Sequence, residues 1–217
     1  MTRDQVIAVL LARAGQRQND LVLKASMETE ILSVQTDLES NAFLPWFLQT
    51  QKDDLALTVA QDTIAFPTGY LRELDEETRK GALYRYDATL TDPWVALTKY
   101  YNFDDMKERL PGAGPTLGYV TIGRSYIVAP VTDVSYTYRT RYFAKDTALE
   151  TNIENNWLKY AEGLIRASLG EVMARYYLHN PALADQFKAD ILLRRNELIL
   201  ADTAQREAGG MRQMGDD

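Results

Sequence analysis

Asp133-Val-Ser-Tyr-Thr-Tyr-Arg-Thr-Arg-Tyr-Phe-Ala144 leads, after a polar linker, into Asn155-Asn-Trp-Leu-Lys-Tyr160 and a long helical stretch. From Tyr136 on, Tyr and Thr at even positions alternate with Thr, Arg and Phe at odd positions. This alternation is typical of a β-strand, because successive side chains of a strand point to opposite faces. From Asn155 onward, apolar residues recur at helical spacing. A strand that leads into helices, without a cluster of catalytic residue types, indicates a docking function.

Two helices are predicted in this C-terminal part. The first carries a wide apolar stripe from Trp157 to Tyr176. Asn180-Pro181 predicts the start of the second, because asparagine is a good N-cap and proline is favoured in the first turn. Gly209 predicts the end of this helix. Residues 211–217 are too polar to fold by themselves.

The N-terminal part is also predicted to be helical. Thr2 is a candidate N-cap for a helix that runs to Ala14 and ends at Gly15. Asn19 or Asp20 caps a second helix, in which apolar residues recur at steps of three or four. The apolar face of this second helix consists of Leu23, Met27, Ile31, Val34 and Leu38. The two helices are expected to form a hairpin.

Between these helical parts the pattern favours strands. Short segments rich in β-forming residues and bounded by turn residues predict strands at 55–60, 82–86, 119–122, 125–129 and 135–143. A short helix is predicted near 94–109, before the rigid loop Pro111-Gly-Ala-Gly-Pro115. The middle of the chain is therefore expected to be rich in β-structure.

We expect an α+β fold, in which a helical bundle built from N- and C-terminal helices carries a β-rich insertion lobe. The expected parts are an N-terminal helical hairpin (1–42), the β-rich lobe (43–150), a C-terminal helical hairpin (151–208) and a flexible tail (209–217). The C-terminal hairpin is expected to pack on the N-terminal helices.

The composition excludes several classes of protein. The 217 residues carry a net charge of -7, which argues against a dedicated binder of nucleic-acid phosphates and suits a wall past which DNA slides. The chain has no cysteine, so disulfides and thiolate chemistry are excluded, and a reducing interior or an assembled particle fits best. No apolar run approaches the roughly 20 residues that a membrane span needs. The first apolar stretch breaks at Arg13, too soon for a signal peptide. We therefore expect no membrane association.

Three patterns resemble chemical sites. Gly118-Tyr-Val-Thr-Ile-Gly123-Arg-Ser125 nearly matches a phosphate-binding loop, but its β-forming residues favour a hairpin that turns at Gly123-Arg124. His179, the only histidine, is explained by a helix C-terminus or by solvent. Acidic clusters such as Asp53-Asp54 and Asp104-Asp105 lack the spacing of a calcium loop. We expect no catalytic residue, no metal and no cofactor, and the protein is not expected to be an enzyme.

Two alternatives stay open. A hydrolase is one, because a pair of catalytic carboxylates is assembled in space rather than in sequence. A nucleic-acid-binding regulator is the other, because the segment from Tyr136 to Arg141 interleaves aromatic and basic residues as single-strand binders do. The acidic balance of the chain favours cross-strand packing of these aromatics instead.

Candidate residues for a partner interface come from the C-terminal third. The arginines of the last helix are explained either by solvation and helix-end electrostatics or by pairing with acidic groups of a neighbouring subunit. Methionine adapts to irregular apolar grooves, so a tail that contains it is a candidate for docking on a partner. The candidate residues are Trp157, Tyr160, Arg194, Arg195, Arg206, Met211 and Met214.

A series of short motifs extends over nearly the full length of the chain. The motifs are Trp94-Val-Ala-Leu97, Asp104 to Pro111, Gly114-Pro115, Tyr119-Val-Thr-Ile-Gly123, Ile127-Val-Ala-Pro130, Tyr136-Thr-Tyr-Arg-Thr-Arg-Tyr142, Asn156-Trp157-Leu158 and Tyr176-Tyr-Leu-His-Asn180, followed by a helix with Phe187 and Asn196. In this order they resemble the head-to-tail adaptor proteins of tailed bacteriophages, also called connector or head-completion proteins.

The resemblance implies a structural protein of the virion that forms a ring, usually of twelve subunits, under the portal at the neck. Helices would surround the DNA channel, the β-rich lobe would face the tail, and the C-terminal segment would reach the portal. The implied partners are the portal protein, a tail or nozzle protein and further copies of the chain. Packaged DNA would pass through without sequence-specific binding. Assembly would take place in the host cytoplasm.

Overall fold

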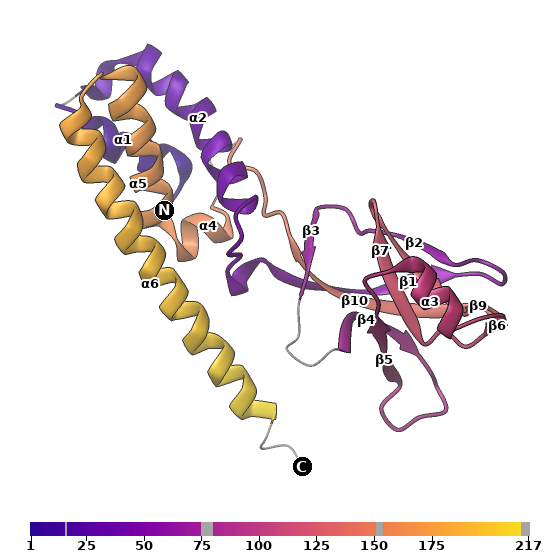
Figure 1. Ribbon diagram of the computed structural model, residues 1–217. Coiled ribbons are helices and arrows are strands. Elements are labelled where there is room, and N and C mark those ends of the chain that lie inside the picture. Colours follow the sequence, from indigo (N-terminus) through magenta and orange to yellow (C-terminus); the bar gives the residue numbers. More distant parts are fainter. Residues whose placement is uncertain (16, 75–79, 151–153, 214–217) are drawn as a thin grey trace. The chain divides into compact units, whose positions relative to one another are not determined.

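Segments from the two ends of the chain fold together, and the middle of the chain folds by itself (Figure 1). The computed structural model describes residues 1–15, 17–74, 80–150 and 154–213. One unit consists of Met1–Leu48 and Asp146–Asp217, and we call it the helical unit. The other consists of Gln49–Lys145, and we call it the β unit. Each unit has its own core and is described by itself.

The described part of the helical unit contains α-helices joined by short 3₁₀ and π segments. The α-helices are α1 (Arg3–Arg13), α2 (Leu21–Glu39), α4 (Asn156–Tyr160), α5 (Glu162–Val172) and α6 (Pro181–Gln213). The shorter segments are the 3₁₀ helices η1 (Arg17–Asn19) and η2 (Trp46–Leu48) and the π-helix η3 (Met173–Tyr177).

The helices begin at polar residues that the sequence indicates. Asp20, Asn155 and Asn180 each accept a hydrogen bond from the backbone amide three residues later, at 2.9, 2.9 and 3.1 Å. Each bond satisfies one of the amide groups that a helix N-terminus leaves without an intrahelical partner. The predicted starts of the second N-terminal helix and of the last helix are confirmed.

The apolar faces of α1 and α2 pack in the core of the helical unit. Their buried apolar side chains are those of Val6, Ile7, Leu10, Leu11, Leu23, Met27, Ile31 and Val34. The spacing of three and four residues predicted the apolar face of α2, because side chains at these intervals lie on one side of a helix.

The buried carboxylate of Glu39, at the end of α2, joins this N-terminal pair to the C-terminal segments. Its Oε1 accepts hydrogen bonds from Gln35 Nε2 at 2.9 Å, from the Asp146 amide at 3.2 Å and from Trp157 Nε1 at 3.2 Å. A buried carboxylate is costly unless its oxygens are hydrogen-bonded. Glu39 therefore favours one arrangement of α2, α4 and the segment of the helical unit that begins at Asp146.

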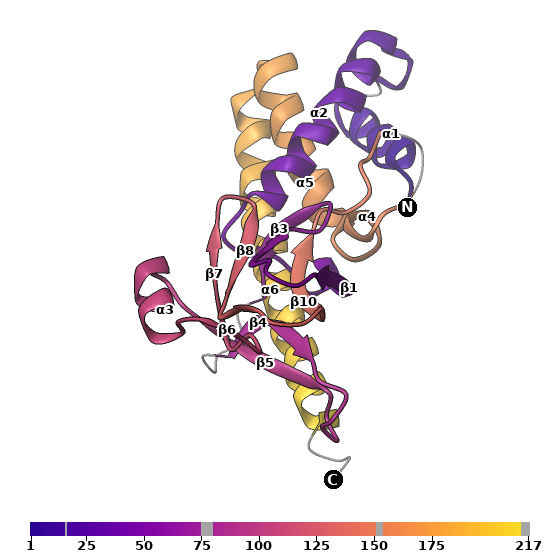
Figure 2. The same ribbon diagram turned by 90° about the vertical axis from the view of Figure 1, so that its right-hand side faces the viewer.

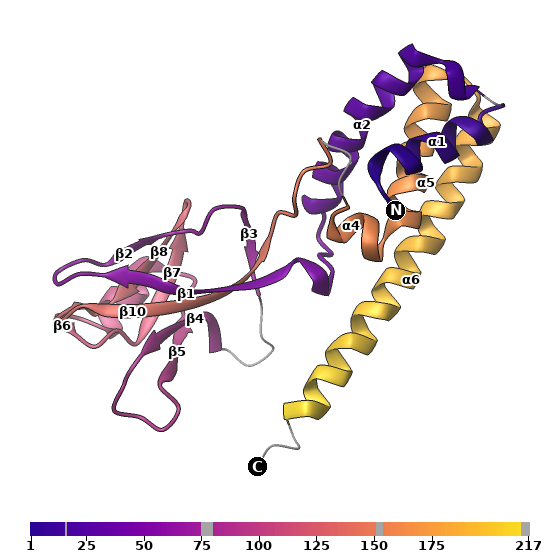
Figure 3. The same cartoon turned by 180° about the vertical axis from the view of Figure 1, so that it is seen from behind.

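Two glycines determine how closely α5 approaches α6, which lies beside it (Figures 1 and 3). A Cβ atom at Gly170 would stand 2.5 Å from Cε1 of Phe187, closer than real side chains pack. A Cβ atom at Gly163 would stand 3.1 Å from Cδ of Arg194. The two glycines are seven positions apart on α5, and Phe187 and Arg194 are seven positions apart on α6. Both contacts therefore lie along one face of each helix.

The β unit is built on an eight-stranded sheet with the order β1-β10-β4-β5-β7-β8-β2, in which β3 also pairs with β10. The strands are β1 (Gln49–Leu57), β2 (Thr63–Ala65), β3 (Tyr70–Glu73), β4 (Lys80–Tyr86), β5 (Trp94–Lys99), β7 (Gly118–Ile122), β8 (Ser125–Ala129) and β10 (Tyr136–Ala144). A two-stranded sheet and one helix complete the described elements, namely β6 (Ala113–Gly114), β9 (Val131–Thr132) and α3 (Phe103–Arg109).

β10 organises the sheet. It pairs with β1 from Gln49↔Phe143 to Leu57↔Tyr136, and its other edge pairs with β3 and β4. The two end strands of the order, β1 and β2, also contact each other, so the sheet curves back on itself. Its core consists of Leu57, Ile64, Leu83, Leu97, Tyr119, Tyr126, Val128 and Tyr138.

β7 and β8 run side by side as a hairpin (Figure 2). The turn contains Gly123 with a φ of +60°, a value that favours glycine. The hairpin predicted at Gly123-Arg124 is confirmed, and the resemblance of this segment to a phosphate-binding loop has no structural basis.

The expected fold class, a helical bundle that carries a β-rich insertion lobe, is wrong. The structure is a mixed α+β fold in which the eight-stranded sheet forms a unit with its own core. Local patterns identify strands, but they do not show which strands pair. The pairing of β10 with β1 joins segments far apart in the sequence, so the size of the sheet could not be predicted from local patterns.

The helix predicted near 94–109 is correct only in its second half. Trp94–Lys99 is strand β5, which pairs with β4 on one edge and with β7 on the other, and the helix spans Phe103–Arg109. At the end of the chain, α6 continues through Gly209 to Gln213, where the sequence predicted a helix end. At Trp94–Lys99 the local signal was overridden by pairing with the neighbouring strands β4 and β7.

We predict that Gly170→Ala destabilises the helical unit by about 1–3 kcal/mol, because its methyl group collides with the ring of Phe187. Gly163→Ala is the matched control. Its neighbour is the flexible side chain of Arg194, and alanine is favoured over glycine in a helix by about 1 kcal/mol. Urea unfolding followed by helical circular dichroism measures both variants. Equal stability of the two variants would contradict the proposed close contact.

Candidate partner interface

The side of α6 that faces away from its buried residues carries an exposed strip without any charged side chain. Phe187 and Leu198 mark the buried side. We call the exposed set the outer strip, and it consists of Ala189, Leu192, Leu193, Asn196, Ile199, Leu200 and Thr203. Exposed fractions of its four large apolar residues are 61% for Leu192, 53% for Leu193, 37% for Ile199 and 70% for Leu200. A row of exposed aliphatic side chains on one helix face is typical of an interaction surface.

The sequence reading missed this strip. Leu183, Phe187, Ile191 and Leu198 recur at helical spacing and indicate one apolar face of the last helix, and the exposed aliphatic residues fall outside it. The signal was nevertheless present, because Leu192 and Ile199, like Leu193 and Leu200, are seven positions apart and fall off that face.

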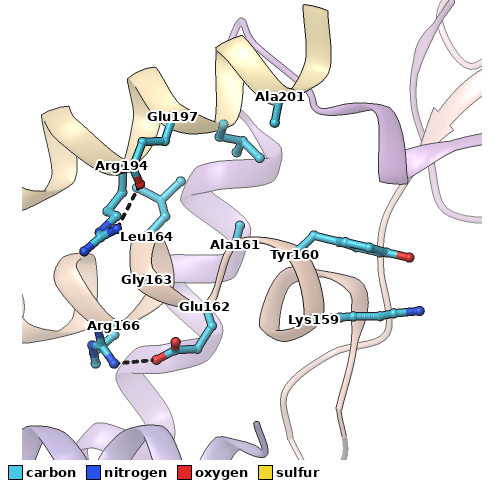
Figure 4. A pocket seen from close by; sticks show the side chains of 11 residues that line it. Lys159, Tyr160, Ala161, Glu162, Gly163, Leu164, Arg166, Arg194, Glu197 and Ala201 are labelled. Atoms are coloured by element: carbon cyan, nitrogen blue, oxygen red, sulfur yellow. Dashed lines mark hydrogen bonds and ion pairs between the residues drawn. The ribbon is translucent and has the colours of Figure 1, made fainter. Parts of the chain in front are cut away.

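A groove of about 430 Å³ lies where α4 and α5 meet α6 (Figure 4). Tyr160 and Gly163 contribute from the α4–α5 side, and Arg194 and Glu197 contribute from α6. Arg194 Nη1 donates to Glu197 Oε2 at 2.9 Å, and both side chains line the groove from α6. The groove is open and polar, which suits contact with a partner chain better than enclosure of a small molecule.

Of the two predicted aromatic interface residues, only Tyr160 is at the surface. Trp157 is 1% exposed, and its ring meets Phe47 edge-on with a centroid distance of 5.1 Å. Tyr160 is half-exposed and stacks on Phe47 with a centroid distance of 5.5 Å. Trp157 therefore belongs to the core of the helical unit, and Tyr160 is retained as a contact candidate.

The three candidate arginines are all engaged within the helical unit. Arg194 pairs with Glu197 as described above, Arg195 Nη2 donates to Asn41 Oδ1 at 2.9 Å, and Arg206 pairs with Asp202 at 2.7 Å. The Arg206 side chain keeps half of its surface exposed. An exposed guanidinium of this kind can accept a second acidic partner, since it carries five donors.

The candidate methionines fall at the limit of the described residues. Met211 lies in the last turn of α6, and its side chain is outside the described part of the chain. Met214 also lies outside the described residues.

The β unit buries a polar cluster around Glu73. Tyr119 donates to Glu73 Oε2 at 2.8 Å, and Lys99 forms an ion pair with the same carboxylate. Burial, assisted by the charge of Glu73, raises the pKa of Tyr119. Burial also raises the pKa of Tyr126 and that of Tyr138 to about 12. Tyrosines held protonated in this way stabilise the interior of the sheet and cannot serve as bases near neutral pH.

The carboxylates of the groove do not form an acid pair. Glu162 binds Arg166 at 2.9 Å, and Glu197 binds Arg194 at the same distance (Figure 4). Within residues 1–15, 17–74, 80–150 and 154–213, no group of three or more His, Asp or Glu could hold a metal ion. None of the described helices is long and apolar enough to cross a membrane.

Comparison with protein families gives a match over nearly the whole chain. The family model described as "SU10 adaptor protein" matches residues 1–214. A search of curated proteins found no match.

We predict that Trp157→Phe lowers the stability of the helical unit by about 1–3 kcal/mol, because the Glu39 carboxylate loses a buried donor. Tyr160→Phe removes a hydroxyl from a half-exposed ring and is expected to change stability by less than about 0.5 kcal/mol. Thermal unfolding of the two variants and of the unaltered chain tests this contrast. A Trp157→Phe protein as stable as the unaltered chain would show that the hydrogen bond from the indole to Glu39 does not contribute to stability.

Proposed function

The chain belongs to the SU10 adaptor protein family, a family of phage head–tail adaptors, and from this premise we propose a specific role for it. The membership confirms the resemblance found in the sequence, and the protein is a structural component of a phage virion. In the proposed role, about twelve copies form a ring under the portal. The ring extends the DNA channel and offers a docking platform to the tail or nozzle protein.

The observation that carries this proposal is the outer strip of α6. A helix whose buried side packs on α5 and whose other side exposes four large aliphatic residues is suited to contact another chain. A ring of identical subunits needs such additional surface, because each copy must contact two neighbours as well as complete its own core. The helical unit has both kinds of surface.

The electrostatic balance supports passage of DNA without binding. The net charge of -7 repels the phosphate backbone at long range. On the β unit, Arg139 is held by Asp53 in a bidentate pair at 3.0 Å and lies over the ring of Trp94 at 4.0 Å. The arginine is thereby engaged within the sheet surface, which favours a structural role over a basic groove for nucleic acid.

The β unit is the proposed platform for the tail. It exposes large apolar side chains outside its core, including Tyr101, Leu117, Ile122 and Val134. Single exposed apolar residues are ordinary on a protein surface. Together on one folded unit, they supply apolar contact area for a tail component, and α6 with its candidate methionines supplies the contact to the portal.

A hydrolase remains without a supporting observation. Such an enzyme needs two carboxylates that converge in a pocket, whereas Glu162 and Glu197 each face an arginine. A nucleic-acid-binding regulator would need a strongly basic surface, and the net charge of -7 opposes long-range attraction of phosphates. We therefore retain the adaptor as the proposed function.

Negative-stain electron microscopy of the protein mixed with its cognate portal protein tests the proposal. We expect rings bound to one end of the portal. A truncated chain that ends at residue 208 serves as a comparison, and reduced ring attachment would assign a docking role to Met211 and Met214. If the full chain stays monomeric under every condition, portal included, the adaptor ring is excluded.

A further inference from the structure

One edge of the outer strip is bordered by basic side chains. Its apolar residues are Leu192 and Ile199, which are seven positions apart. Lys188, Arg195 and Arg206 lie three, four or seven positions from them and so on the same side of the helix. The exposed Asp185 and the buried Asp202 share this spacing, so basic residues outnumber acidic ones there by three to two. Lys188 is exposed, and Arg206 keeps half of its surface exposed beside Asp202. We call this side the basic edge.

The opposite edge is bordered by acidic side chains. Its apolar residues are Leu193 and Leu200, again seven positions apart. Asp190 and Glu197 lie three or four positions from them. Arg194 lies between these two carboxylates and pairs with both, at 4.0 and 2.9 Å, so the acidic residues outnumber the basic one. Glu197 keeps half of its surface exposed although it pairs with Arg194. We call this side the acidic edge.

The centre line of the strip differs from both edges. It consists of Ala189, Asn196 and Thr203, which are small or polar and spaced by seven. A single partner helix lying face-on would bury Asn196 and leave the four large aliphatic residues at the margin. Two partner helices, one on each side, would bury the aliphatic residues and leave Asn196 accessible to water. Burial of apolar area favours the second arrangement.

We propose that the basic edge of α6 in one copy binds the acidic edge of α6 in the next copy. The occupant of each edge is thus a second copy of this chain. Apolar contact comes from Leu192 and Ile199 against Leu193 and Leu200, and the flanking charges of opposite sign fix which edges meet. The inference rests on the proposed ring and names the surface that closes it.

The charges also fix the relative direction of the helices. Flanking charges of parallel neighbours can pair in opposite signs, as at the e and g positions of coiled coils. Antiparallel neighbours would bring like edges together, and like charges side by side are unfavourable. Adjacent copies in a ring of about twelve are related by a small rotation, so their helices point in nearly the same direction. A contact between two different edges is also the heterologous type that closes into a ring rather than stopping at a dimer.

The absence of cysteine from the chain makes a direct test practical. Four double variants combine one cysteine from each edge, so that different offsets between neighbours are sampled: Leu192→Cys or Ile199→Cys with Leu193→Cys or Leu200→Cys. All four positions are exposed, so folding is expected to be retained. Assembled protein is oxidised and separated on a non-reducing gel.

Bridges within one chain are excluded by geometry. Adjacent helical side chains do not face each other. The other two pairs are separated by about 9 and 12 Å along the helix axis, beyond the reach of a disulfide. The matched control is Leu21→Cys with Val22→Cys, an adjacent pair on α2 that is even more exposed.

At least one double variant is expected to give a ladder of dimers, trimers and larger species, while each single variant and the α2 control stay monomeric on the gel. Electron microscopy of the unaltered chain shows whether rings form at all, and so distinguishes failure of the edge-to-edge contact from failure of the adaptor ring. Rings without a ladder would place the subunit contact elsewhere and leave the adaptor function intact. Dimers from a single variant would indicate a two-fold contact and overturn the edge-to-edge arrangement. Absence of both rings and ladders would overturn the adaptor ring itself.

Discussion

The helical unit depends on the hydrogen bonds of one buried carboxylate, that of Glu39. Groups from three segments donate to the same oxygen: Gln35 in α2, the Asp146 amide and the indole of Trp157 in α4. Because a buried charge without donors is strongly destabilising, these segments are held in one arrangement. The N-terminal helices are thereby joined to the C-terminal third of the chain, in which α5 also packs against α1, α2 and α6.

The two faces of α6 differ in their surroundings: the inner face is packed within the helical unit, and the outer face is exposed. On the inner face, Phe187 packs against Gly170, and a side chain at that glycine would leave no room for the ring. On the outer face, Leu192 and Leu200 are exposed and part of a strip without charge. A helix that is apolar on both sides is usually buried on both sides. In a single copy only the inner face is covered, so the structure of one chain is consistent with a component of an assembly.

Sequence patterns predicted what depends on neighbours along the chain. The caps at Asp20 and Asn180 and the hairpin at Gly123 follow from local chemistry, and all three are confirmed. The size of the sheet depends on pairing between distant strands, which leaves no local signal, and the predicted helical bundle with an insertion lobe was therefore wrong. The burial of Trp157 likewise has no local signal, because Glu39, which accepts the hydrogen bond from its indole, lies 118 positions away in the sequence.

In the proposed assembly, neighbouring copies cover the outer strip of α6. Hydrogen–deuterium exchange of rings and of monomers, compared over residues 189–203, tests it most directly. Packing of neighbours against the strip is expected to slow exchange of these amides in the ring, because opening of the helix then also requires separation of the copies. Equal exchange of residues 189–203 in rings and monomers would contradict the claim.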